Sequence, residues 1–541
     1  MTTIRYRPIP SLPRLAWLAV IAPDGRSIDV YHGSAVECRE QWMVEGVWDG
    51  DFAKGEFHRS DHFFGSGIRV DDDGIWIVPS TALVDRVFSC WHRGSLLASN
   101  SCVVLLGFTG ATLDPHHDYG LECHAIRRGV THYDPTFRVL HREIPSFQQH
   151  FYRRLVVTGD GVRQVAPPPD PVLTSFEHYH GLLVAALWRI RDNSMSGLRR
   201  TPVAAFATIS AGYDSPAVAA VARELGVDTA FTSWRSNTHV PRWLSPAAAI
   251  DDGKRIAEAM GLRAWYLDRP RPRITEDELF FLAASTPPLA LVFHAMARHI
   301  ENLPGVAIVF TGFQGDYVWD ARPEPKYLNE EMTGNDTAGL GLTEIRLKSG
   351  IINLAVPFMY ARRIADLATI SAGPAMAPWR IGGDYDRPIP RRLAESAGVP
   401  RPWFGLKKKA VVITYAYPIH RGLRRDFGEY VRRHFGYPPA FVVWHALVNK
   451  VAFVVVRTMH VIRRRLTGRA PRTPQMFFWK DFDPSRLMYV WAVETLAGRF
   501  RTILRGHGVS LEAVTNASAA TAPAFATSSG EGRTQWNSAT A

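Results

Sequence analysis

A short segment of small, hydroxyl-bearing and acidic residues lies between an apolar run and a helical pattern near the middle of the chain. It reads SAGYDS at 210–215 and follows the run VAAFATI. Small residues such as Gly212 let the backbone approach an anion at such a bend, and the unpaired amides at the helix start point toward it. The hydroxyl groups of Ser210 and Ser215 can add donors. Asp214 would repel a phosphate by itself, so its presence favours a Mg²⁺ ion held against phosphate oxygens.

Alternating strand and helix patterns surround this segment and must position it. The expected strands lie at 203–209, 228–234, 263–268 and 306–312. Helical patterns separate them, and Thr275 followed by Glu278 forms a capping box for one helix. Alternation at this spacing predicts an α/β domain with a doubly wound parallel sheet. Nucleotide sites in such sheets lie at the carboxyl ends of the strands, where this segment is expected.

The segment matches neither of the common glycine-rich phosphate loops, because no Lys follows its glycine and G-x-G-x-x-G is absent. It resembles the Ser-Gly-Gly-x-Asp-Ser pyrophosphate loop of the N-type ATP pyrophosphatases, a family that includes asparagine synthetase, β-lactam synthetase, GMP synthetase and tRNA thiolation enzymes. The resemblance implies that Ser210, Gly212, Asp214 and Ser215 bind ATP and its leaving pyrophosphate. Ala211 replaces the usual glycine and has less backbone freedom. On this motif alone, an ordinary strand-to-helix turn remains the alternative interpretation of residues 210–215.

A second segment strengthens the resemblance. TGFQGD at 311–316 is similar to the Ser-Gly-x-Gly-x-Asp segment that follows the equivalent strand in asparagine and β-lactam synthetases. The resemblance assigns Gly312 to nucleotide binding and Asp316 to a second Mg²⁺ contact. Because Asp214 and Asp316 come from different strand ends, they could share a metal that bridges the phosphates. A loop or helix-cap carboxylate is the alternative for Asp316.

Glu344 is a candidate base by a further resemblance. The segment 343–368 contains Pro357-Phe358, which is similar to the Pro-Phe-Leu-Asp segment of asparagine synthetases. The stretch around Glu344 resembles the region that gives β-lactam synthetase a glutamate, which works with a tyrosine to deprotonate the attacking amine. Phe313 stands at what looks like the tyrosine position and cannot ionise, so that dyad is incomplete. A surface helix carboxylate is the alternative.

Lys408 is the candidate catalytic cation. The segment 386–411 is similar to the family segment in which a charged residue contacts the phosphates, and counting from Pro400 places the family's lysine on Lys408. The run at 407–409 leaves the register open by one residue. A lysine here can neutralise charge on the α-phosphate and the pyrophosphate. Solvated surface lysines are the alternative.

The first part of the chain, 1–165, reads as short strands with turn signals, of which Asp-Asp-Asp-Gly at 71–74 is the clearest. The stretch APPPDPV interrupts the pattern, which places a boundary before an ATP-binding domain at 174–415. This β-rich part resembles the glutaminase domain of the family, an Ntn-hydrolase-like fold. Those enzymes use a Cys at residue 2, whereas Thr2 stands here. We therefore expect a degenerate, structural domain, with Thr2 disfavoured as a nucleophile.

Composition limits the partners. The chain has 541 residues, enough for several domains, and a net charge of +12. A helical, basic extension is expected at 416–514 and a disordered tail at 515–541. The apolar stretch 440–456 is interrupted by polar residues and is short of the roughly 20 residues that span a bilayer, so a buried or interfacial helix is expected. Peripheral membrane contact through this basic region stays open, and nucleic acid is not expected.

The chain is expected to be an ATP- and Mg²⁺-dependent ligase that adenylates a small-molecule or peptide carboxylate and passes the acyl group to ammonia or an amine. All four cysteines precede residue 124 and form no C-x-x-C pair, which predicts no zinc, no disulfide framework and a reduced, cytoplasmic protein. The absence of cysteine after Cys123 also disfavours tRNA sulfur transfer and deazapurine nitrile synthesis. A catalytically silent nucleotide-binding or interaction module is the alternative, favoured by Ala211, Phe313 and the altered first domain.

Overall fold

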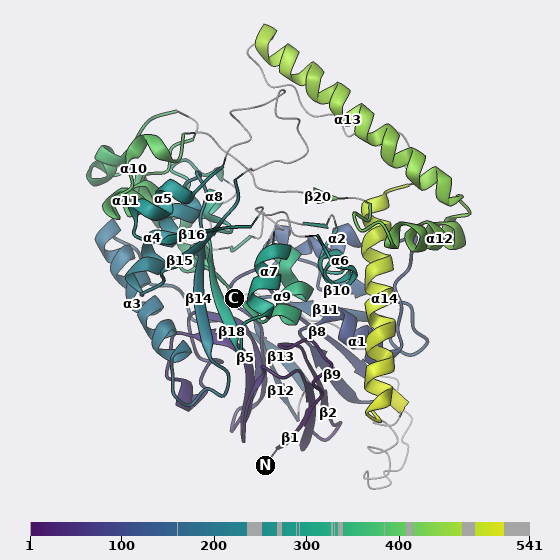
Figure 1. Ribbon diagram of the computed structural model, residues 1–541. Helices are drawn as coiled ribbons and strands as arrows, with labels where there is room; N and C mark the ends of the chain where they lie inside the picture. The colour runs from purple at the N-terminus through teal and green to yellow at the C-terminus, as the bar shows by residue number, and fades with distance from the viewer. Residues whose placement is uncertain are drawn as a thin grey trace.

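The chain forms a β-rich N-terminal region, a later parallel sheet with helices around it, and a group of C-terminal helices (Figure 1). The structure is a computed structural model. It describes residues 2–159, 161–234, 251–267, 273–287, 289–290, 293–325, 328, 331–333, 339–383, 385–406, 414–415, 417–467 and 482–512. The disordered tail expected at 515–541 lies outside these residues.

Two mainly antiparallel sheets make up the N-terminal region. One has the order β1-β3-β2-β9-β8-β11-β10 and the other the order β13-β12-β7-β6-β5-β4. Their strands are β1 (Thr3–Pro8), β2 (Trp17–Ile21), β3 (Ser27–His32), β4 (Glu37–Arg39), β5 (Trp42–Trp48), β6 (Phe63–Asp71), β7 (Gly74–Val78), β8 (Val87–His92), β9 (Ser95–Ser99), β10 (Thr136–Arg138), β11 (Ser146–His150), β12 (Arg154–Thr158) and β13 (Gly161–Val165). Apolar side chains from both sheets share one core, so the sheets pack face to face.

The turn at 71–74 is as expected, whereas the pairing of the first strand, β1, is not. Asp71 pairs with Gly74 across the β6–β7 hairpin, which confirms the turn predicted at 71–74. β1 was not expected as a strand, and it pairs in parallel with β3 although all other pairs in the two sheets are antiparallel. Residues 166–172 form no helix or strand, in agreement with their proline content.

The second region contains a five-stranded sheet in the order β16-β15-β14-β18-β19, in which every pair is parallel. Its strands are β14 (Val203–Thr208), β15 (Thr229–Thr232), β16 (Arg263–Tyr266), β18 (Val306–Thr311) and β19 (Ile351–Ala355). The four strands predicted from the sequence are confirmed as β14, β15, β16 and β18. The strand order reverses between β14 and β18, so the carboxyl ends of these neighbours form the switch point at which ligands bind in open parallel sheets.

Helices surround the sheet and form the end of the chain. They are α1 (Cys102–Thr109), α2 (Tyr119–Cys123), α3 (Phe176–Ser194), α4 (Asp214–Glu224), α5 (Lys254–Ala259), α6 (Glu276–Ala283), α7 (His294–Glu301), α8 (Gly315–Val318), α9 (Thr343–Ser349), α10 (Ile364–Ala372), α11 (Pro388–Ser396), α12 (Leu423–Phe435), α13 (Pro439–Thr467) and α14 (Pro484–Gly506). In Figure 1, α4 and α5 lie on one side of the parallel sheet and α7 and α9 on the other. The capping box of Thr275 and Glu278 is confirmed at the start of α6.

The part of the chain expected as a helical extension, 416–514, contains α12, α13 and α14. α14 runs along α1, whereas α13 extends away from the rest of the chain (Figure 1). The helix expected at 440–456 belongs to α13, which continues to Thr467. Of the two expected arrangements, the buried helix is wrong, because many of its apolar side chains are exposed, and the interfacial helix stays a prediction. Among the described residues, none of the helices has the length and apolar character needed to cross a membrane.

A buried ion network joins the two regions. Arg346 of α9 donates two hydrogen bonds to Glu45 of β5, at 2.8 and 3.0 Å, and a third to Asp85. All three side chains are at most 3% exposed. Ser66 and Asn100 also donate to Glu45, at 2.7 and 3.1 Å. Because buried charges are tolerated only when paired, this network ties α9 firmly to the N-terminal region.

Candidate functional site

The segment 210–215 lies at the carboxyl end of β14 and leads into α4. The hydroxyl oxygens of Ser210 and Ser215 are 2.9 Å apart, and the Gly212 amide donates to the Ser210 hydroxyl at 3.2 Å. These contacts fold the segment back on itself. A methyl group added at Gly212 would meet no atom closer than 3.4 Å, so protein packing does not demand this glycine. Its Cβ position would make only ordinary contacts with the hydroxyl groups of Ser210 and Tyr385, and Gly212 itself is half-buried.

The second segment, 311–316, packs directly against the first. A methyl group at Gly312 would lie 2.9 Å from the backbone carbonyl carbon of Asp214, and one at Gly315 would lie 2.6 Å from the carboxyl carbon of Asp214. Both distances are too short for a real side chain. These two glycines therefore permit the close approach of the two segments, and they set the position of the Asp214 carboxylate.

Arg387 joins the two segments electrostatically. One of its terminal nitrogens lies 3.1 Å from each carboxylate oxygen of Asp214, and the other donates to the backbone carbonyl of Asp316 at 3.1 Å. The Arg387 side chain is 6% exposed and that of Asp214 is 21% exposed. Burial opposes the charge on Arg387, but Asp214, Tyr385 and Asp316 outweigh it and raise its pKa. Burial, followed by the charge of Asp214, also raises the pKa of Tyr385. Arg387 thus binds the Asp214 carboxylate directly and interacts electrostatically with Tyr385 and Asp316.

Neighbouring residues hold the first segment in place. Asp251 accepts a hydrogen bond from the Ala211 amide at 2.9 Å, and the Gly405 amide donates to the Ala211 carbonyl at 3.0 Å. Arg391 donates to the Tyr213 hydroxyl at 2.6 Å, and its guanidinium lies 4.9 Å from the centre of the same ring. Both backbone groups of Ala211 are therefore used in fixing the segment. The methyl group of alanine is accommodated at this position.

Glu344 lies in the interface between the two regions. Its side chain is 1% exposed, and its carboxylate accepts from the Ser101 hydroxyl at 2.8 Å and from the Cys102 amide at 2.9 Å. It thereby caps α1. Burial raises its pKa to about 7, although Ser101 and the nearby amides oppose the shift. The alternative of a surface carboxylate is wrong. The hydrogen bonds of Glu344 join it to Ser101, Cys102 and Ser285, which are not predicted site residues.

The remaining sequence candidates are placed as follows. Lys408, with its neighbours at 407 and 409, lies outside the described residues. Phe313 packs its ring against Phe293, with ring centres 5.8 Å apart. The Thr2 hydroxyl donates to the Gly25 carbonyl at 2.8 Å, at one end of the N-terminal sheets. The structure thus brings together Ser210, Gly212, Ser215 and both aspartates, and keeps Thr2 and Glu344 in other surroundings.

Sequence reasoning missed Arg387 and Asp251. Arg387 lies inside the segment 386–411 that resembles the phosphate-contacting segment of the family. Its positive charge directly before a proline that starts a helix could have indicated it. Asp251 had no comparable signal, because its contact to Ala211 depends on the fold. Within the described residues, no group of three or more His, Cys, Asp or Glu could hold a metal. No family model matches the chain, and no curated protein matches it.

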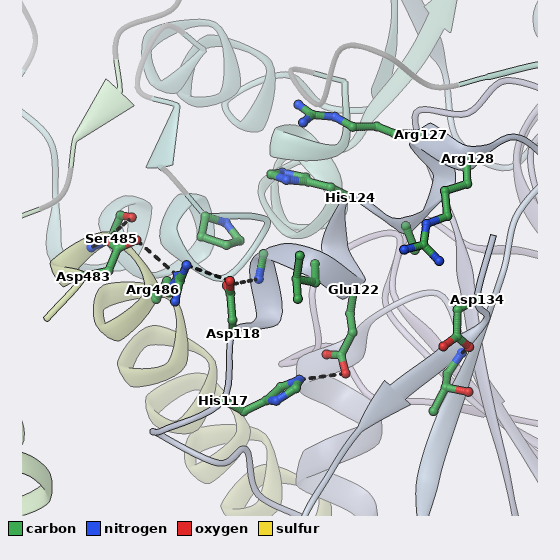
Figure 2. A pocket seen from close by; sticks show the side chains of 15 residues that line it. His117, Asp118, Glu122, His124, Arg127, Arg128, Asp134, Asp483, Ser485 and Arg486 are labelled. Carbon is green, nitrogen blue, oxygen red and sulfur yellow. Dashed lines mark hydrogen bonds and ion pairs between the residues drawn. The ribbon is translucent and has the colours of Figure 1, made fainter. Parts of the chain in front are cut away.

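A separate cavity of about 680 Å³ lies between the α2 region and the start of α14 (Figure 2). Several of its charged groups are paired with one another. Arg486 contacts Asp118 at 2.7 Å, and His117 contacts Glu122 at 3.0 Å. None of the residues that line it belongs to the segments at 210–215 or 311–316. The cavity is therefore distinct from the site at the strand ends.

Proposed function

We propose that the chain is an ATP-dependent amide-forming ligase that resembles asparagine synthetase in its ATP-binding half. The observation that carries this proposal is the contact of segments 210–215 and 311–316 at the carboxyl ends of neighbouring strands, where Asp214, Asp316 and Arg387 form one cluster. The parallel sheet would then be an adenine nucleotide α-hydrolase-like domain. The N-terminal region would be an Ntn-hydrolase-like glutaminase domain that has lost its nucleophile, since Thr2 stands at the position of the family's cysteine.

The residues of the cluster have defined tasks in this proposal. The hydroxyl groups of Ser210 and Ser215 and the amides at the start of α4 bind the leaving pyrophosphate. The carboxylates of Asp214 and Asp316 fit Mg²⁺, because this ion is commonly held by one or two carboxylates together with substrate phosphates. When bound, the ion would neutralise charge on the phosphate oxygens. Arg387 supplies a fixed positive charge between the two segments, and it balances the carboxylates.

The reaction class follows from this set of groups. A bound pyrophosphate leaving group favours attack of a carboxylate oxygen on the α-phosphorus, which gives an acyl adenylate. The acyl carbon then passes to ammonia or an amine, and an amide and AMP result. The substrate carboxylate is a small molecule or a peptide. Lys408 stays the candidate for neutralising charge on the α-phosphate, and Glu344 a weaker candidate for amine deprotonation.

A catalytically silent nucleotide-binding module is the second candidate. It is favoured by the Asp214–Arg387 pair, because one guanidinium nitrogen contacts both carboxylate oxygens that a metal would need. In the ligase, nucleotide and Mg²⁺ must compete with this contact. In a silent module, Arg387 would stay bound to the Asp214 carboxylate, which then could not bind a metal ion.

Release of pyrophosphate separates the two candidates. The full-length protein is incubated with ATP, Mg²⁺ and a panel of amino acids and short peptides that carry carboxylates and amines. The ligase proposal predicts pyrophosphate and AMP in equal amounts, and their loss in Asp214→Asn. The matched control is Asp228→Asn, because Asp228 is an exposed carboxylate at the amino end of neighbouring β15. ATP binding without pyrophosphate release for any member of the panel supports the silent module.

A further inference from the structure

Helix α13 is anchored on one face of its first turns. Val442 is 6% exposed and His445 is fully buried. The His445 ring packs against Phe482, with ring centres 4.9 Å apart, and it hydrogen-bonds to the Tyr417 hydroxyl. Asn449, one turn later, donates to His445 at 2.8 Å. This face therefore points toward the body of the protein, and α12 is the helix against which α13 packs.

The opposite face of α13 exposes a continuous set of apolar side chains, here named the α13 stripe. Its members, each 46–63% exposed, are Val443, Trp444, Leu447, Val451, Val455, Met459 and Ile462. They account for 7 of the 19 large apolar side chains that are exposed in the described part of the chain. At 100° per residue, their positions span about 160° of the helix circumference, so they form one face. An exposed apolar face of this extent marks an interaction surface.

The charges of α13 indicate what covers the stripe. The helix contains five Lys or Arg residues and no Asp or Glu. Lys450, Arg457 and Arg464 recur every seven residues, which places their positions along one border of the stripe. Two copies of this helix packed through the stripe would bring the six charges of their two basic borders to one seam, and neither helix has a carboxylate to compensate them. Charge therefore disfavours a second copy and favours an anionic surface.

We infer that the α13 stripe docks the protein on an anionic lipid bilayer. An amphipathic helix with basic residues beside an apolar face lies along the membrane plane, and it buries that face at the boundary of headgroups and acyl chains. Trp444 belongs at this depth because its ring has an apolar body and a polar edge. The protein body stays on the side of Val442 and His445, which is opposite the stripe. The side chains of the stripe are exposed, and Figure 1 shows that α13 extends beyond the other helices.

Cosedimentation of the full-length protein with vesicles tests this inference. Vesicles of phosphatidylcholine alone are compared with vesicles that also contain phosphatidylglycerol. We expect binding to the anionic vesicles, weak binding to the neutral ones, and a decrease with salt. Each basic residue near an anionic surface contributes on the order of a fivefold change in affinity, so Lys450→Gln is expected to lower binding by about that factor. Equal binding to both vesicle types would overturn the electrostatic part of the inference.

Variants test the stripe itself. Val451→Asp places a charge in its centre and is expected to reduce binding to anionic vesicles by at least about tenfold. The matched control is Met195→Asp, because Met195 at the end of α3 is also 63% exposed but lies outside the stripe. Unchanged binding by Val451→Asp would overturn the inference. Sedimentation velocity without lipid gives a second test. If the wild type self-associates and Val451→Asp abolishes this self-association, the stripe packs against a second copy and the inference is overturned. Pyrophosphate release is independent of either outcome.

Discussion

Replacing Arg346 with methionine removes the cation that neutralises two buried carboxylates between the regions of the chain. Methionine keeps most of the apolar stem, so the loss is mainly of charge and hydrogen bonds. Removing one partner of a buried ion pair costs about 3–5 kcal/mol, because the remaining charge stays buried without compensation. Glu45 keeps its hydrogen bonds from Ser66 and Asn100. Asp85 loses the partner that opposes its desolvation, so it carries most of the cost.

The pH dependence of this loss of stability follows from the protonation of Asp85. Burial raises its pKa to about 6 even with Arg346 present, and removal of the cation raises it further. In Arg346→Met the folded protein therefore binds a proton at Asp85 that the unfolded chain has already released. Stability then falls as the pH rises from 6 to 8, because the folded state must either keep this proton or bury a bare charge. The deficit of the variant is expected to grow over this interval.

Urea unfolding at pH 6 and pH 8, followed by circular dichroism and tryptophan fluorescence, measures the deficit. The matched control is Lys348→Met on the same helix, because Lys348 pairs with Glu301 and Asp277, whose side chains are 34% and 50% exposed. Such a pair is worth about 1 kcal/mol or less. A deficit for Arg346→Met that is no larger than that of the control, or one that shrinks at pH 8, would refute the reasoning.

Three further changes test other parts of the structure. Glu344→Gln keeps the bond from the Cys102 amide, can donate to the Ser101 hydroxyl, and cannot ionise. Because the pKa of Glu344 is raised from 4.5 to about 7 on folding, the wild type should lose about 2 kcal/mol between pH 5 and pH 7 that the variant retains. Equal slopes in urea titrations would contradict this. Gly315→Ala should cost about 1–3 kcal/mol in thermal or urea unfolding because its methyl group meets Asp214, whereas Gly212→Ala has room and should unfold like the wild type. Arg387→Met should increase the thermal shift that Mg²⁺ alone produces, since Asp214 loses its cationic partner; a shift unchanged from the wild type would show that Arg387 and the ion do not compete.

The parts of the fold that follow local sequence rules could be predicted. β14, β15 and β18 are short apolar runs with turn residues at their ends, and the hairpin at 71–74 has the residues that its turn requires. The segments 210–215 and 311–316 stood out because small and acidic residues directly follow two of these runs. Their meeting then depends only on the rule that parallel strands end at the same edge of the sheet.

Contacts between distant parts of the chain could not be predicted. Arg387 meets Asp214 across 173 residues, and Glu344 meets Ser101 across 243 residues. Nothing local distinguishes Glu344, in the polar stretch TEIRLKS, from a carboxylate on a solvated helix face. At α13 the apolar composition left a buried and an interfacial helix both open, and the structure rules out the buried one. Burial depends on whether another element covers the face, and a single helix carries no information about its neighbours.

Binding of a non-hydrolysable ATP analogue, measured by calorimetry with and without Mg²⁺, tests the central claim most directly. If Asp214 and Asp316 hold the ion against the phosphates, the wild type binds the analogue at least about tenfold more tightly with Mg²⁺. Asp214→Asn and Asp316→Asn each lose this difference, and Asp228→Asn keeps it. Binding that is independent of Mg²⁺, or that both aspartate variants retain in full, would contradict the account.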